Sequence, residues 1–121
     1  MIVAMAAGLC VLVGGTTTAS AASLSDCGSG YACLYDYKGH SGSYAKFHSY
    51  ISYLGNFNMD NKATSLYNNG NNCTASFYQL SSKRGYRLDL QKGYVIYNLA
   101  NTRMTSSKTW NNRITSGYYC Q

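Results

Sequence analysis

Short segments of alternating or aromatic-rich residues, separated by polar clusters, run along most of this chain. Such segments are typical of β-strands, and no sustained helical period competes with them. The separating clusters are rich in Gly, Asn and Ser, which tolerate turn conformations. We therefore predict an all-β protein. The predicted strands cover residues 32–37, 43–48, 63–68, 74–80, 86–90, 94–99 and 113–119.

The connections between these strands are of two kinds. Four polar clusters have the composition of turns, and they cover residues 38–42, 68–72, 81–85 and 91–93. The stretch 101–110 has no clear period and is the longest irregular connection. A connection of this kind is either a functional loop or a mobile one.

The N-terminus indicates export. Residues 1–15 are almost wholly apolar, and a run of small residues ending in Ala-x-Ala follows, so we predict that 1–21 is a signal peptide that is removed. The apolar run is shorter than the roughly 20 residues that span a bilayer, which makes a membrane anchor the weaker interpretation. No Lys or Arg precedes it, which leaves the true start of the signal open. The expected mature protein is a secreted, extracellular chain of residues 22–121, without insertion into a membrane.

Export also sets the expected state of the cysteines. The chain outside the predicted signal contains Cys27, Cys33, Cys73 and Cys120, and an even number in an exported protein predicts two disulfides. Sequence permits three pairings. Cys27 and Cys33 bracket a Gly-Ser-Gly turn, which favours a local bridge and leaves Cys73 for Cys120. A zinc site would need paired Cys-x-x-Cys or His spacings, which these residues lack.

Composition narrows the class of protein further. Tyrosine occurs 13 times, and charged residues make up only 12% of the chain, which argues against a disordered tail or a coiled coil. The formal charge is +6, and Lys83, Arg84 and Arg87 cluster around one predicted hairpin beside Tyr86. Export argues against nucleic acid as a partner. The cluster fits an acidic cell-envelope polymer or an acidic protein surface, unless it is simply a solvated face that keeps the protein soluble.

The predicted mature chain lacks a set of residues for catalysis. It contains His40 and His48, four aspartates and no glutamate, and its cysteines are expected to be oxidised. No nucleophile, base and orienting group can be assembled from these residues, and no metallopeptidase, hydrolase or phosphate-binding motif is present. We expect a protein that is not an enzyme.

The chain also repeats itself. Residues 34–36, followed by a glycine-closed turn, are echoed by 77–79 and a similar turn 43 residues later. Residues 60–65 (Asp-Asn-Lys-Ala-Thr-Ser) are echoed by 111–116 (Asn-Asn-Arg-Ile-Thr-Ser) 51 residues later. Two copies of one supersecondary unit are therefore predicted. The second copy is longer by 8 residues, and the irregular stretch 101–110 is the natural place for the insertion.

These duplicated features resemble the βγ-crystallin Greek-key domain, in which a strand, a glycine-closed turn and an (Asn/Asp)-(Asn/Asp)-x-x-(Ser/Thr)-Ser stretch occur twice. More specifically, the chain resembles a family of secreted bacterial peptidase inhibitors with that fold, typified by a metalloproteinase inhibitor. Members begin with Cys-x-x-Gly-Tyr-x-Cys-Leu-Tyr, as residues 27–35 do. The resemblance implies one disulfide-stapled β-sandwich over residues 22–121, built of two Greek-key motifs, about 31–69 and about 73–120.

One position departs from the βγ-crystallin pattern. The aromatic residue usually found two positions before the closing glycine is His40 in the first copy and Lys83 in the second. This change weakens the aromatic corner under each turn. We expect Tyr44 or Tyr86 to supply the packing instead.

The resemblance implies a monomeric inhibitor of an extracellular peptidase that binds by inserting a rigid loop. Residues 68–72 and 101–109 are the candidate loops, and neither aligns with the reactive segment of the family. The alternative is a calcium-binding structural or toxin-like module that binds cell-envelope components.

Calcium ligands are also implied by the resemblance. The duplicated hexapeptides would each lend oxygen atoms to two sites, together with carbonyls from turns near 38–39 and 82–83. Only one of the eight residues is acidic, so binding is expected to be weak, with a dissociation constant of about 0.1 to 1 mM. The same residue types bond to nearby backbone in tight turns, and a purely structural role is an equal alternative. The implied ligands are Asp60, Asn61, Thr64, Ser65, Asn111, Asn112, Thr115 and Ser116.

Overall fold

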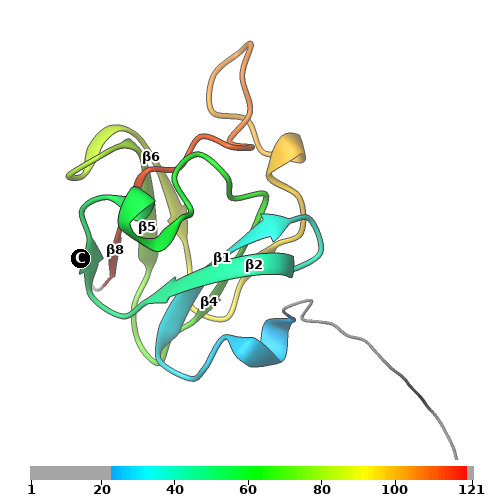
Figure 1. Ribbon diagram of the computed structural model, residues 1–121, viewed down its shortest axis with the longest axis vertical. Helices are drawn as coiled ribbons and strands as arrows, with labels where there is room; N and C mark the ends of the chain where they lie inside the picture. Colours follow the sequence, from blue (N-terminus) through cyan, green and yellow to red (C-terminus); the bar gives the residue numbers. More distant parts are fainter. Residues whose placement is uncertain (1–22, 120–121) are drawn as a thin grey trace, which may run out of the picture.

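A computed structural model describes residues 23–119, which form a β-sandwich of two antiparallel, four-stranded sheets (Figure 1). The first sheet has the spatial order β2 (Ser41–Phe47), β1 (Tyr31–Tyr37), β4 (Ser65–Asn69) and β7 (Val95–Ile96). The second has the order β3 (Tyr50–Ile51), β8 (Ser116–Tyr119), β5 (Ala75–Leu80) and β6 (Arg84–Leu90). Three short 3₁₀ helices also occur in this part of the chain: η1 (Leu24–Asp26), η2 (Leu54–Phe57) and η3 (Leu99–Asn101).

This architecture confirms the all-β prediction. Each of the seven predicted strands overlaps an observed strand, and only β3, which has two residues, was not predicted. Where a strand was predicted over 94–99, the observed β7 covers only Val95–Ile96, and the chain enters η3 at Leu99. Where a strand was predicted over 113–119, the observed β8 begins only at Ser116. Within residues 23–119, no helix is long and apolar enough to cross a bilayer.

The two halves of the chain exchange strands. Strand β3 comes from the first half but pairs with β8, with Tyr50 opposite Tyr118. Strand β7 comes from the second half but pairs with β4, with Leu66 opposite Ile96. Each sheet therefore contains three strands from one half and one from the other, and the two halves interlock.

The halves also repeat the same backbone geometry. The register shifts near Asp36 in β1 and near Gln79 in β5, at equivalent positions. His40 and Lys83 both adopt the left-handed region, with φ of 61° and 60°. Equivalent hydrogen bonds join Thr64 N to Tyr35 O (2.8 Å) and Thr115 N to Tyr78 O (2.9 Å), and likewise Leu99 N to Thr64 O (2.6 Å) and Leu54 N to Thr115 O (2.7 Å). These matched contacts confirm the predicted duplication.

Side chains from both sheets fill one hydrophobic core between them. Phe47 of the first sheet meets Phe77 of the second edge to face, with ring centroids 5.9 Å apart. Gly117 makes room for this contact, since a Cβ atom there would lie 2.7 Å from the Phe47 ring. The core also contains the residues Ala32, Leu34, Ala45, Ile51, Leu54, Met59, Ala63, Leu66, Ala75, Leu90, Leu99, Trp110, Ile114 and Tyr119.

A smaller buried cluster lies around the disulfide between Cys27 and Cys33, which confirms the predicted local bridge. Tyr35 completes this cluster, and its hydroxyl donates a hydrogen bond to Ser23 O at 3.0 Å. Cys120 and the predicted signal peptide lie outside the described residues, so the bridge between Cys73 and Cys120 stays a prediction.

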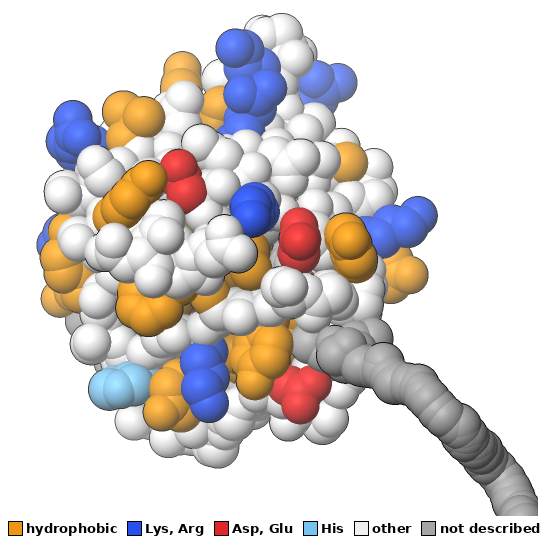
Figure 2. Space-filling model, viewed as in Figure 1, with side chains coloured by type: hydrophobic (Ala, Val, Ile, Leu, Met, Phe, Trp, Pro, Cys, Tyr) orange, Lys and Arg blue, Asp and Glu red, His pale blue; other side chains and the backbone are white. Residues whose placement is uncertain are grey.

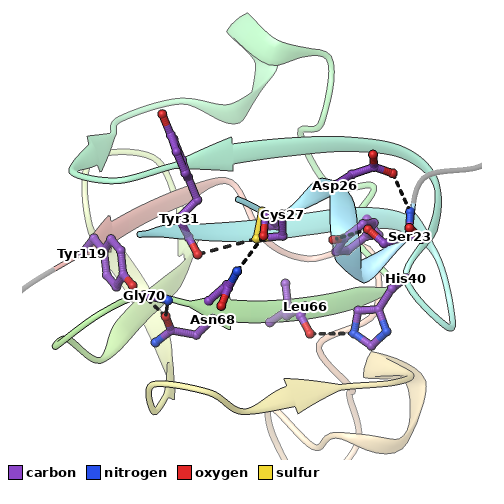
Figure 3. The surroundings of a disulfide bond; sticks show 12 residues. Ser23, Asp26, Cys27, Tyr31, His40, Leu66, Asn68, Gly70 and Tyr119 are labelled. Atoms are coloured by element: carbon purple, nitrogen blue, oxygen red, sulfur yellow. Dashed lines mark hydrogen bonds between the residues drawn. A yellow bond between two sulfur atoms is a disulfide. The ribbon is translucent and has the colours of Figure 1, made fainter. Parts of the chain in front are cut away.

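His40 corrects the expectation for the turn between β1 and β2. Its ring is buried and packs edge to face against Tyr35 at 5.2 Å, so the histidine itself fills the aromatic corner. Nε2 of His40 donates to Leu66 O at 2.8 Å, as Figure 3 shows. Tyr44 adds a ring stacked on Tyr35 at 5.8 Å. In the second half, Lys83 lies over the ring of Tyr118, with its Nζ 4.2 Å from the centroid.

Asn68 is a buried polar hub between the two halves (Figure 3). Its Nδ2 donates to Cys73 O (2.9 Å) and to Leu90 O (2.8 Å). Its Oδ1 accepts from Gly70 N (2.9 Å) and from the Tyr119 hydroxyl (2.8 Å). All four hydrogen-bonding positions of the amide are satisfied, so one side chain links β4 to β6, to β8 and to the chain before β5.

We expect Asn68→Ala to lower the free energy of unfolding by about 3 to 4 kcal/mol, because the substitution leaves several buried polar groups without hydrogen-bond partners. Asn72→Ala is the matched control, since Asn72 is exposed and should change stability by less than about 0.5 kcal/mol. Urea unfolding of both variants measures the difference. Equal stability of the two variants would contradict the role given to Asn68.

The ionisation of Tyr35 makes the folded protein less stable at alkaline pH. Burial, reinforced by the charge of Asp26 and by Tyr44 and Tyr67, raises the pKa of Tyr35 to about 12 from 10.0. The unfolded chain therefore loses this proton at lower pH than the folded chain, so the stabilisation is complete below pH 10 and is lost as pH rises towards 12. The expected loss from this residue is about 2 to 3 kcal/mol.

Tyr35→Phe should remove that part of the pH dependence, whereas Tyr94→Phe, at a side chain that is 62% exposed, should retain it. Urea unfolding at pH 9 and near pH 11.5 makes the comparison. A Tyr35→Phe slope as steep as that of the wild type would show that Tyr35 does not cause the loss.

Candidate functional site

The two hexapeptides implied as calcium ligands lie side by side where the halves meet. Asn61 N donates to Ile114 O and Asn112 N donates to Ala63 O, both at 3.0 Å. Asn61 and Asn112 both have positive φ, 54° and 58°, a conformation that Asn tolerates well. The hydroxyl of Thr115 donates to Asn61 Oδ1 at 3.3 Å, which joins a side chain of one hexapeptide to a side chain of the other.

The last serine of each hexapeptide holds a turn. Ser65 Oγ donates to Tyr37 O at 2.7 Å and accepts from His40 N at 3.0 Å. Ser116 Oγ donates to Leu80 O at 2.6 Å and accepts from Lys83 N at 3.2 Å. Both serines are fully buried. Their hydroxyls are therefore engaged with backbone, in the structural role that the sequence left open.

The first residue of each hexapeptide has a buried oxygen atom without a donor. Oδ1 of Asp60 and Oδ1 of Asn111 have no hydrogen-bond partner within residues 23–119. Leaving a buried acceptor unsatisfied costs about 1 to 3 kcal/mol, and more for a charged group. Two equivalent oxygen atoms in this condition fit a calcium ion, which takes carboxylate and amide oxygens as ligands.

A surface cavity of about 290 Å³ opens beside the hexapeptides. It brings together Asn61, Asn112 and Thr115 from the implied ligand set, whereas Asp60, Thr64, Ser65, Asn111 and Ser116 are not among its lining residues. Gln79, Leu80 and Arg113 complete the lining, and the sequence did not single them out as site residues. The repeat offset that relates 34–36 to 77–79 was the signal that could have indicated Gln79. Arg113 places a fixed positive charge here, which opposes a bound cation.

Acidic ligands are scarce in this region. No group of three or more His, Cys, Asp or Glu side chains that could hold a metal ion occurs in the described part of the chain. Thr64, which is half-buried, donates its backbone N–H to Tyr35 O. The arrangement therefore offers neutral oxygen atoms and a single carboxylate, that of Asp60.

The first candidate loop, 68–72, is tied closely to the body of the protein. Besides the bonds of Asn68, Asn71 accepts a hydrogen bond from the Ser29 hydroxyl at 3.0 Å. Gly70 lies against Tyr119, where an added Cβ atom would overlap the hydroxyl. Only Asn71 and Asn72 are exposed.

The second candidate loop projects from the sandwich and is the orange segment of Figure 1. We call residues 102–110 the hairpin, because Arg103 and Thr109 form an antiparallel bridge and Trp110 N donates to Thr102 O at 2.9 Å. Its exposed residues are Arg103, Ser106, Ser107 and Lys108. Trp110 at its end is buried in the core.

The basic cluster near β6 is largely engaged within the protein. Arg84 donates to Ser81 O at 3.0 Å and to Ser81 Oγ at 2.9 Å. Arg87 forms an ion pair with Asp89 at 3.2 Å, and both side chains are about half exposed. Asp89 balances only the charge of Arg87, so Arg84 and Lys83, which lies over the Tyr118 ring, keep their positive charges while these contacts hold them in place.

Solved structures show the same fold at low sequence identity. A structure described under the evolution of the eye lens βγ-crystallin domain fold aligns with a TM-score of 0.66 and 16% identity, covering 77% of this chain and 87% of that one. A βγ-crystallin domain from Clostridium beijerinckii aligns with a TM-score of 0.58 and 12% identity, covering 74% and 96%. The N-terminal domain of Protein S aligns with a TM-score of 0.58 and 13% identity, covering 75% and 96%. These similarities confirm the predicted βγ-crystallin-like fold.

The sequence comparisons give the family. No curated protein matches the chain significantly. The profile of peptidase inhibitor family I36 matches residues 20–88, which is more than half of the chain. An inhibitor profile on a crystallin-like fold indicates a protein that binds its target and is not an enzyme. The chain belongs to peptidase inhibitor family I36.

Proposed function

We propose that this protein is a secreted inhibitor of an extracellular peptidase and that it acts by inserting a rigid loop into the peptidase cleft. The family match over residues 20–88 is the observation that carries the proposal. The disulfide between Cys27 and Cys33 supports export, since such bridges persist in oxidising compartments. The apolar segment and small-residue run at 1–21 support it independently.

The interlocked fold supplies the rigidity that such a mechanism needs. Each sheet depends on a strand from the other half, and Asn68 adds hydrogen bonds to Leu90 and Tyr119, which are distant from it in sequence. A loop that is already ordered loses little conformational freedom on binding, so more of the contact energy remains as affinity. A binding interface of about 1,600 Å² can then be tight without covalent chemistry.

We expect the mature protein at micromolar concentration to slow peptide hydrolysis by at least one secreted endopeptidase. Thermolysin, subtilisin and trypsin form the test panel because they differ in mechanism and specificity. Inhibition should saturate with one inhibitor per enzyme, and the reduced and alkylated protein should inhibit less, since it lacks the disulfide. Absence of inhibition of all three enzymes would remove the proposal.

A second proposed property is weak calcium binding between the hexapeptides. It is favoured by the buried Oδ1 atoms of Asp60 and Asn111, which lack donors among residues 23–119. Asp60, Asn61 and Thr115 would hold an ion on one side, and Asn111, Asn112 and Thr64 on the other. A bound calcium ion would cross-link the two halves, because each set contains residues of both hexapeptides. Lys62 and Arg113 lie inside the hexapeptides and oppose tight binding.

Calcium at 10 mM should raise the free energy of unfolding by about 1.4 kcal/mol if the dissociation constant is about 1 mM. For a chain of this size that corresponds to an increase in Tm of roughly 6 to 10 °C. Asp60→Asn should abolish most of the shift, and magnesium at equal ionic strength is the control. An unchanged Tm in calcium, or the same shift with magnesium, would rule out a calcium site.

A further inference from the structure

The hairpin stands outside the part of the fold that is duplicated. In the first half, η2 ends at Phe57 and the buried Met59 precedes the hexapeptide. In the second half, η3 ends at Asn101 and the buried Trp110 precedes the equivalent hexapeptide. The two connections therefore join equivalent elements, and the second is longer. The first half shows that the fold can form without these additional residues.

The hairpin is nevertheless held in one conformation. Met104 N and Thr105 N both donate to Lys108 O, at 2.9 and 3.1 Å. The Arg103 guanidinium donates to Ser106 O at 2.8 Å, and Ser107 N donates to Thr105 Oγ1 at 3.3 Å. At the base, Met104 packs against the core, as does the buried Trp110. A projecting segment with this many internal bonds is pre-ordered for binding.

The charged residues of the hairpin, Arg103 and Lys108, are both basic. All four acidic residues of the chain occur at or before Asp89, whereas Lys92, Arg103, Lys108 and Arg113 follow it. Figure 2 shows basic and no acidic side chains at the end of the molecule where the hairpin projects. Lys108 is exposed, and no acidic side chain in residues 23–119 forms an ion pair with it. Its charge is therefore free to meet an acidic surface.

We propose that the hairpin is the segment that enters the peptidase cleft, and that Lys108 selects a peptidase whose cleft is lined by acidic side chains. This inference rests on the proposed inhibitor function. The Lys108 carbonyl already accepts two backbone N–H bonds, so it is not free to enter an oxyanion hole. The hairpin thus blocks the cleft without being cleaved after Lys108.

The other candidate loop fits this role less well. Asn68 and Gly70 are bound into the fold by hydrogen bonds and by the Tyr119 contact. Residues 68–72 carry no charge and expose only two asparagines. The hairpin projects from the sandwich, is held by internal hydrogen bonds and carries charge. The loop at 68–72 is held by hydrogen bonds but neither projects nor carries charge.

Two variants and one matched control test the inference against an enzyme of the panel that the wild type inhibits. Lys108→Glu should raise the inhibition constant at least about tenfold, which is about 1.4 kcal/mol. Lys92→Glu makes the same charge change at an exposed turn residue and should change the constant less than about threefold. Replacing residues 103–109 by two glycines should abolish inhibition. Two glycines can close the shortened loop, because Trp110 N lies only 2.9 Å from Thr102 O at the base of the hairpin.

The outcomes separate the inference from the function on which it rests. Loss of inhibition by Lys108→Glu and not by Lys92→Glu, with an unchanged Tm and an uncleaved inhibitor, supports the hairpin. If both hairpin variants inhibit with the same inhibition constant as the wild type, the inference is overturned and the inhibitor function remains intact. Equal weakening by Lys92→Glu, or cleavage after Lys108, also overturns it. If the wild type inhibits no enzyme of the panel, both proposals fail. Lys108→Glu keeps the test decisive if the shortened chain does not fold.

Discussion

Neither half of this chain can complete a sheet by itself, because β3 and β7 each pair with strands of the opposite half. Because of this exchange the chain passes repeatedly between the sheets, and the hexapeptides lie at two of these crossings, between β3 and β4 and between β7 and β8. There Ser65 and Ser116 use buried hydroxyls to hold the turns that lead out of β1 and β5. The two halves therefore form a single core, and we expect them to unfold together.

The exchange of strands does not fix the length of one segment, the connection between η3 and Trp110. The hydrogen bonds that are repeated in both halves fix the strands and turns, but none of them depends on how many residues this connection contains. An insertion there disturbs neither sheet, because Thr102 and Trp110 remain adjacent at its base. Binding surfaces are commonly carried by loops on a rigid scaffold for this reason.

Sequence pattern predicted the strands and the duplication because both depend on local alternation and on similarity between segments. It did not predict β3, which is too short to show a period, or the role of Asn68. That residue lies in an Asn- and Gly-rich stretch typical of a turn, and only its contacts with Leu90 and Tyr119 make it a buried hub. Likewise, Asn and Thr occur both in turns and in calcium sites, so the family resemblance implied a set of ligands but the residue types could not decide their role.

The two hexapeptides have diverged in charge while keeping one geometry. The first keeps a carboxylate in Asp60, whose buried Oδ1 lacks a donor in the described chain. The second replaces it by Asn111 and places Arg113 in the adjoining cavity. A neutral amide and a nearby guanidinium weaken the electrostatic attraction for a cation at the crossing. Arg113 also adds to the positive charge of the half that carries the hairpin. Any contribution of calcium to stability thus depends mainly on the first half, and the second half is better suited to meeting an acidic partner.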